Sequence, residues 1–241
     1  MPVLEVHEVV KNFRGLRAVG GVSLHVADAQ IVGLIGPNGA GKTTLFHAIA
    51  GATAIDSGEV RYDGKRISGL RPDQICRAGI SRTFQIMRPF AGLSVLDNVI
   101  VGALARERSL SEARRLSLLV LEQLGLGPRA HIPAASLTLP ERKRLEVARA
   151  LATRPRLLLL DEVMAGLRPT ETDQMVSTFL QINREQGIAI LLIEHVMRAV
   201  MALASQIVVL HHGEVLTRGA PAEVVRSPEV LEVYLGTESE H

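Results

Sequence analysis

The sequence has 241 residues, of which 47% are hydrophobic and 22% are charged, a balance that is typical of globular proteins and excludes wholesale disorder. Lysine and arginine number 27 against 25 aspartates and glutamates, and so small and dispersed an excess does not predict binding to nucleic acid. The single cysteine, Cys76, excludes an internal disulfide and a cysteine metal cluster, and no apolar run approaches the ~20 residues of a membrane span, so we expect a soluble, cytoplasmic chain.

Short strands are predicted in the N-terminal part of the chain. Ile31–Ile35 is almost wholly apolar, as expected of a strand that is buried on both faces, and Asp63-Gly64 is a turn signal. A helix is predicted from about Thr43 to Ala50, where Gly51 ends the helical pattern. The four strands predicted in this part are Leu4–Val10, Val22–Val26, Ile31–Ile35 and Glu59–Tyr62.

The middle of the chain, residues 93–154, is predicted to be helical, because its apolar residues recur at helical spacing. From Arg156 onward, apolar strands alternate with helices, which predicts a mostly parallel sheet with right-handed crossovers. We therefore predict one α/β domain over residues 1–241, with a helical subdomain of about residues 93–154 inserted into its core. The elements predicted after Arg156 are strands at Leu157–Leu160, Ile188–Ile193 and Gln206–Leu210, and helices near Glu171–Gln186 and His195–Ala204.

The strongest functional signal is Gly36–Thr43, which reads G-P-N-G-A-G-K-T and matches the phosphate-loop pattern G-x-x-x-x-G-K-[ST]. Its glycines allow backbone N–H groups to surround phosphate oxygens, and the helix that follows points its positive end at them. We expect Lys42 to reach the outer phosphates and the Thr43 hydroxyl to bind Mg²⁺. An ordinary glycine-rich turn is the alternative, but this loop follows a buried strand and opens a helix, as the motif requires.

Two acids follow the strand of four leucines. Asp161 and Glu162 are expected at the carboxyl edge of the parallel sheet, where ligands bind in such folds. We expect Asp161 to be a partner of Mg²⁺ and Glu162 to polarise the water that attacks the nucleotide. A buried strand with an ordinary polar end is the alternative, and the phosphate loop disfavours it.

Between these motifs, Thr138 and Glu141 have the spacing of a helix capping box, and Pro140 falls in the first turn, where a missing N–H costs little. Leu145 and Ala148 continue the pattern as an apolar face. Taken alone, this segment predicts no more than a well-capped amphipathic helix.

The phosphate loop, the capped segment and the acidic end of the leucine strand occur in an order that resembles the ATP-binding cassette (ABC) ATPases over nearly the whole chain. The resemblance implies a P-loop NTPase core with a mostly parallel sheet, an N-terminal antiparallel β subdomain and an inserted helical subdomain. It also gives meaning to three residues that are weak signals alone. Phe13 would stack on adenine, Gln85 would join the subdomains and sense metal and water, and His195 would contact the γ-phosphate.

The resemblance also implies the ligands, ATP and Mg²⁺, and the residues that bind them. Nucleotide binding is implied for Phe13, Gly36, Pro37, Asn38, Gly39, Ala40, Gly41, Lys42, Thr43, Thr44, Thr138 and Glu141. Mg²⁺ binding is implied for Thr43, Gln85 and Asp161, and catalysis for Lys42, Gln85, Glu162 and His195.

The resemblance narrows to the ATPase subunits of branched-chain amino acid uptake systems at three places: Arg82–Phe90, Leu145–Leu151 with Asp161–Leu167, and the tail Gly219–Gly236. The ATPases of lipopolysaccharide export share the tail and remain an alternative. A soluble cassette ATPase that acts on nucleic acid or ribosomes is disfavoured, because the chain has one cassette and no sustained heptads between its ATP motifs. A regulatory subunit with little catalysis is disfavoured by the intact Glu162 and His195.

The segment that corresponds to the family's Leu-Ser-Gly-Gly-Gln signature departs from it and reads Leu137-Thr-Leu-Pro-Glu141. In this family each ATP lies between one subunit's phosphate loop and the other's signature, and Pro140 removes an N–H that meets the γ-phosphate. The chain departs from the family pattern at two further positions. Val163 stands where the family usually has a proline after the catalytic glutamate, and Arg168 stands where its dimer-contact loop usually has aspartate or asparagine. We therefore predict a heterodimer with a sister ATPase, with a homodimer as the alternative. We expect it on the cytoplasmic face of the membrane, where it works with permease subunits and, indirectly, a periplasmic solute-binding protein, without nucleic acid.

Overall fold

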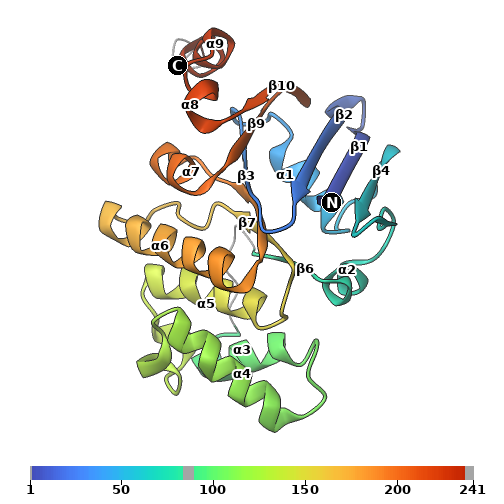
Figure 1. Ribbon diagram of the computed structural model, residues 1–241. Coiled ribbons are helices and arrows are strands. Elements are labelled where there is room, and N and C mark those ends of the chain that lie inside the picture. Colours follow the sequence, from blue (N-terminus) through green and yellow to red (C-terminus); the bar gives the residue numbers. More distant parts are fainter. Residues whose placement is uncertain (1, 84–89, 237–241) are drawn as a thin grey trace.

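The computed structural model describes residues 2–83 and 90–236. Gln85 lies outside this part of the chain. The described residues form two β-sheets and a set of helices (Figure 1). The smaller sheet is antiparallel, with the strand order β2-β1-β4-β5, and corresponds to the predicted N-terminal β subdomain. Its strands are β1 (Pro2–Phe13), β2 (Leu16–Ala27), β4 (Ser57–Tyr62) and β5 (Lys65–Arg66).

The larger sheet has six strands in the order β10-β9-β3-β8-β7-β6. All neighbouring pairs are parallel except β9 with β10, so the prediction of a mostly parallel sheet is confirmed. The antiparallel edge strand β10 was not predicted. The six strands are β3 (Ile31–Ile35), β6 (Ile80–Arg82), β7 (Leu157–Asp161), β8 (Ala189–Ile193), β9 (Gln206–His211) and β10 (Glu214–Gly219).

The helices occur where the periodicity predicts them, with further short helices beside them. The region predicted to be helical holds α3 (Val95–Ala103), α4 (Leu110–Gln123) and α5 (Leu139–Leu151). In Figure 1, α3 and α4 lie at the opposite end of the molecule from α8 and α9. The other helices are α1 (Lys42–Ile49), α2 (Pro72–Ala78), α6 (Pro169–Gln186), α7 (Met197–Leu203), α8 (Pro221–Val224) and α9 (Pro228–Gly236).

The six-stranded sheet separates two apolar clusters, because its central strands are buried on both faces. Leu157 and Leu159 of β7 belong to the cluster that contains α1 and the antiparallel sheet. Leu158 and Leu160 belong to the cluster built from α3 to α7. This alternation is the period-two pattern of a strand in a covered sheet. No helix within residues 2–83 and 90–236 is long and apolar enough to cross a membrane.

Gly102 generates the first prediction, because α3 and α5 approach each other closely there. A Cβ at this position would lie well inside van der Waals contact of the Arg149 carbonyl oxygen, which is a backbone atom that cannot yield without moving α5. We expect Gly102→Ala to lower the free energy of unfolding by about 1–3 kcal/mol, measured by urea denaturation. Gly92→Ala is the matched control, because nothing lies within 4 Å of its added Cβ. Equal stability of the two variants would contradict the close approach.

Candidate active site

The phosphate loop connects β3 to α1 in a strained conformation that requires glycine. Gly36 has φ +148° and Gly41 has φ +97°. A Cβ at either position would collide with a backbone carbonyl oxygen, that of Leu210 or that of Ala18, respectively. The turn is closed by the Ala40 N–H, which donates to the Pro37 carbonyl at 3.2 Å. These constraints leave the N-terminal end of α1 facing an open cavity.

This cavity has a volume of about 680 Å³ and brings together residues that are far apart in the sequence. Phe13, the phosphate loop from Asn38 to Thr44, and Glu162 all line it, as the sequence predicts for a nucleotide site. Four lining residues were not expected: Leu16, Arg17, Ala18 and His212. His212 is brought in because the turn after β9 is held against the loop, where the Gly213 N–H donates to the Ala40 carbonyl at 3.1 Å. No pattern in the sequence signals that contact.

Lys42 is buried and bound to the loop that carries it. Its Nζ donates to the Gly36 carbonyl at 2.6 Å and to the Pro37 carbonyl at 2.9 Å. Burial lowers the pKa of Lys42, while the nearby charges of Glu162 and Asp161 raise it. The ammonium therefore stands between loop carbonyls and two carboxylates, at the point where a phosphate would compete for it.

Asp161 ends β7 and is fully buried. Its Oδ2 accepts a hydrogen bond from Arg82 Nη2 at 2.6 Å, and its backbone N–H donates to Thr83 Oγ1 at 3.1 Å. Its Oδ1 has no hydrogen-bond partner within the described part of the chain. A buried carboxylate oxygen that still needs a partner is the type of ligand that a hard divalent cation such as Mg²⁺ prefers. Asp161 does not itself line the cavity, whereas Thr43, in the first turn of α1, does.

Glu162 adopts a backbone conformation that is rare for a side-chain-bearing residue, with φ +51°. Such a conformation costs roughly 1–3 kcal/mol and persists only where the surroundings enforce it. Its backbone N–H donates to the Ile193 carbonyl at 2.9 Å. Its Oε1 lies 3.1 Å from His195 Nε2. The structure therefore brings two of the four predicted catalytic side chains into direct contact.

Two buried charges beside this pair were missed by sequence reasoning. Lys143 on α5 is 6% exposed, and its Nζ donates to the Glu162 carbonyl at 3.0 Å. Glu194 is 2% exposed, and its Oε1 accepts from the Met164 N–H at 2.7 Å. Burial raises the pKa of Glu194 to about 7, partly offset by the Met164 N–H and the Lys143 charge. Lys143 stands in the basic run Arg142–Arg144, and no pattern in the sequence marks it as the buried member.

The predicted cap at Thr138 and Glu141 is present, but these residues do not line the cavity. Glu141 Oε2 accepts from both the backbone N–H and the hydroxyl of Thr138, each at 2.9 Å. Glu141 Oε1 forms an ion pair with Arg129 at 3.0 Å. The Thr138 N–H is the largest of the interactions that lower the pKa of Glu141. The Thr138 hydroxyl is thus engaged within its own chain.

Phe13 has the exposure that a stacking residue needs. The ring is 46% exposed at the end of β1, and Lys11 Nζ lies 5.3 Å from its centroid.

Tyr234 of α9 lies at the start of the phosphate loop. Burial raises the pKa of the Tyr234 phenol, and a hydrogen bond from the Gly36 backbone lowers it. The C-terminal helix α9 therefore contacts the start of the phosphate loop.

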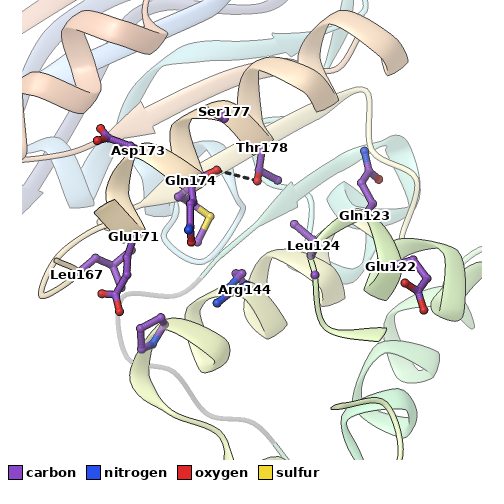
Figure 2. Close-up of a pocket in the computed structure, with 13 residues that line it drawn as sticks. Glu122, Gln123, Leu124, Arg144, Leu167, Glu171, Asp173, Gln174, Ser177 and Thr178 are labelled. Carbon is purple, nitrogen blue, oxygen red and sulfur yellow. Dashed lines mark hydrogen bonds between the residues drawn. The ribbon is translucent and has the colours of Figure 1, made fainter. Parts of the chain in front are cut away.

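A separate groove of about 510 Å³ lies between α6 and the ends of α4 and α5 (Figure 2). Arg144 lies in the middle of the view, below Gln174 of α6. The groove shares no lining residue with the nucleotide cavity. It is therefore a feature of the boundary between the helical segment and α6, apart from the phosphate chemistry.

Comparison with known proteins places these features in a family. The ABC transporter model matches residues 19–165, and a model for the branched-chain amino acid ATP-binding cassette transporter matches residues 214–240. The chain is 39% identical to the high-affinity branched-chain amino acid transport ATP-binding protein BraF of Pseudomonas aeruginosa, with 98% of each chain covered. It is 36% identical to the corresponding protein LivG of Escherichia coli K12 at the same coverage.

A solved structure has the same fold. The ADP conformation of MJ1267, an ATP-binding cassette of an ABC transporter, superposes with a TM-score of 0.89 at 29% identity, covering 98% of this chain and 99% of that one. The predicted P-loop NTPase architecture is therefore confirmed.

Glu194 generates a prediction on pH and stability. Its pKa of about 7 lies above the ordinary glutamate value of 4.5, so the folded state binds more protons than the unfolded state between these values. The free energy of unfolding therefore falls as the pH rises through this window. Glu194→Gln removes the buried charge and keeps an acceptor for Met164. We expect the free energy of unfolding of the variant to exceed that of the wild type by up to ~3 kcal/mol at pH 8, and by little at pH 4.5.

Urea unfolding at both pH values measures this difference. Glu185→Gln on exposed α6 is the matched control and should leave the pH dependence unchanged. A gain from Glu194→Gln that is equal at both pH values would contradict the buried carboxylate as its source.

Proposed function

The chain belongs to the ABC transporter family of ATPases, and from this premise we propose that it energises the uptake of branched-chain or related amino acids across the cytoplasmic membrane. The observation that carries the ATPase role is the cavity in which the phosphate loop, Phe13 and Glu162 meet. The amino acid substrate is supported by the names of the full-length relatives and by the family model for the C-terminal tail.

We propose the following roles in ATP hydrolysis. Phe13 stacks on the adenine, and the loop N–H groups bind the phosphates. Lys42 exchanges its bonds to the Gly36 and Pro37 carbonyls for bonds to the phosphates. Glu162, in contact with His195, orients the attacking water and accepts its proton.

Thr43 and Asp161 are the described residues that would hold Mg²⁺, with Gln85 as the remaining candidate ligand. The cation would neutralise charge that develops on the phosphates during transfer. The unpartnered Oδ1 of Asp161 supports this assignment. Arg82 binds the other oxygen of the same carboxylate at 2.6 Å and so fixes its orientation.

Coupling to the membrane requires a surface for the permease subunits, and we propose the groove of about 360 Å³ between α2, α3 and α5. Val101 is 45% exposed at this groove, and Arg82 lines it too. Arg82 links the groove to Asp161 through a buried ion pair. The chain would therefore lie on the cytoplasmic face of the membrane, beneath permeases that receive solute from a periplasmic binding protein.

We also propose that the chain pairs with a sister ATPase rather than with itself. The Thr138 hydroxyl is bonded to Glu141 within the chain, and Pro140 has no N–H to offer to a partner's nucleotide. The signature segment therefore offers few hydrogen-bond donors to a phosphate. The same chain nevertheless has all the predicted residues of the other half of an ATP site, namely the phosphate loop, Glu162 and His195. A sister subunit with an intact signature would complete this chain's site and leave the other site weak.

Two substitutions test the proposed ATPase roles. Glu162→Gln removes the base but no phosphate contact, so kcat should fall by about 10²–10⁴-fold while the affinity for ATP stays within about threefold.

Lys42→Ala removes a charged hydrogen-bond donor to the phosphates, so ATP affinity should fall by about tenfold or more. A fluorescent ATP analogue measures binding, and released phosphate measures turnover. Equal loss of binding and turnover in Glu162→Gln would contradict its assigned role.

The pairing proposal predicts that restoring the signature activates the chain alone. Pro140→Gly returns one N–H, and we expect the ATPase rate of the isolated chain to rise by about tenfold or more. Pro128→Gly is the control, because Pro128 also lies in the first turn of a short helix, Gly127–Arg129. If the unmodified chain alone already hydrolyses ATP as fast as it does with a sister ATPase, the proposal fails.

A further inference from the structure

Lys143 occupies a position where a charge is costly unless it is used. It is 6% exposed on α5, and Glu146 and Val147, one turn further along the helix, are buried as well. A buried ammonium persists where a polar partner compensates for its lost hydration. Its hydrogen bond, at 3.0 Å, goes to the backbone carbonyl of Glu162. The Lys143 ammonium therefore binds the main chain of Glu162, the residue whose side chain lines the nucleotide cavity.

Glu194 approaches the same turn from another element. It follows β8 directly, precedes His195 and is 2% exposed. Its Oε1 accepts from the Met164 N–H at 2.7 Å, while its Oε2 has no hydrogen-bond partner among residues 2–83 and 90–236. Like Lys143, it directs a buried ionisable group at the main chain rather than at another side chain. Lys143 and Glu162 are the charged groups that act on it.

The two side chains therefore bracket one turn, Glu162–Met164. Lys143 binds the carbonyl at its start, and Glu194 binds the N–H at its end. The Glu162 N–H is fixed in addition by the Ile193 carbonyl at 2.9 Å. This turn contains the φ of +51° at Glu162. A conformation that is unfavourable for glutamate is held by bonds from α5, from β8 and from the residue that follows β8.

We propose that Lys143 and Glu194 are positioning residues for ATP hydrolysis, which hold the Glu162–Met164 turn so that the Glu162 carboxylate stays against His195 and the nucleotide cavity. Neither side chain lines the cavity, so neither is expected to bind ATP. The proposal rests on the ATPase role of Glu162. Because α5 begins at Leu139, beside the signature residue Thr138, the same helix that meets a partner's nucleotide also holds this chain's base.

The test compares disruptive with conservative variants in the full-length chain, purified from its own host with its bound partner subunits. Lys143→Met and Glu194→Ala each remove a bond to the turn, and we expect kcat to fall by about 10–100-fold while ATP affinity stays within about twofold. Lys143→Arg and Glu194→Gln keep a donor and an acceptor, respectively, and should retain most of the activity. Leu145→Ala is the matched control for α5, because it removes buried apolar contacts but neither of these two hydrogen bonds to the turn.

A second measurement separates positioning from general damage. In a Glu162→Gln background the residue to be positioned no longer acts as a base, so Lys143→Met should cause no further loss of kcat. Circular dichroism and a melting curve establish that each variant is folded at the assay temperature. If folded Lys143→Met keeps the wild-type kcat, or if its loss persists undiminished in the Glu162→Gln background, the positioning role is wrong. If Glu162→Gln itself turns over normally, the proposed function fails instead.

Discussion

The register of three parallel strands determines where the chemistry of this protein lies. Leu34 of β3 and Asp161 of β7 both pair with Ile193 of β8, so the carboxyl ends of these strands meet at one edge of the sheet. Within the strands every side chain is covered on both faces, and an unpartnered polar group there would be costly. Polar residues are therefore confined to the carboxyl end of each strand, as at Asp161, and to the residues that follow it. The phosphate loop, Glu162 and His195 gather at one place for this reason.

Carboxylates that lie close together at an apolar edge repel one another and lose hydration. Buried cations near these carboxylates compensate for both effects. Arg82 binds Asp161, Lys42 lies near Asp161 and Glu162, and Lys143 lies near Glu194. Two of these cations bind backbone carbonyls rather than closing ion pairs. They hold the main chain while leaving carboxylate oxygens available, as the unpartnered Oδ1 of Asp161 illustrates. A cation that binds main chain can be redirected to an entering phosphate at small cost, whereas a closed ion pair would resist it.

Sequence reasoning recovers what is encoded contiguously. The phosphate loop and the acids at 161 and 162 are read from neighbouring residues, and the apolar runs predict the strands around them. The bonds from Arg82 to Asp161, Lys143 to Glu162 and Glu194 to Met164 span 79, 19 and 30 positions. Strand register and helix packing create these contacts, and no local pattern announces them. The edge strand β10 was missed for a similar reason, since its residues are partly exposed and carry little apolar alternation.

Helix α5 connects the two ends of the proposed reaction cycle. Its first turn carries the signature segment, and Lys143 follows Thr138 by five residues, about 7.5 Å of helix rise. A helix moves largely as a rigid rod, because its backbone hydrogen bonds are all formed within the helix itself. Under the proposed pairing, a partner's nucleotide at the first turn would act on the same helix that carries Lys143, whereas the Glu162 turn is anchored separately through β8 and Glu194. The hydrogen bond of 3.0 Å from Lys143 Nζ to the Glu162 carbonyl is the contact that joins α5 to this turn.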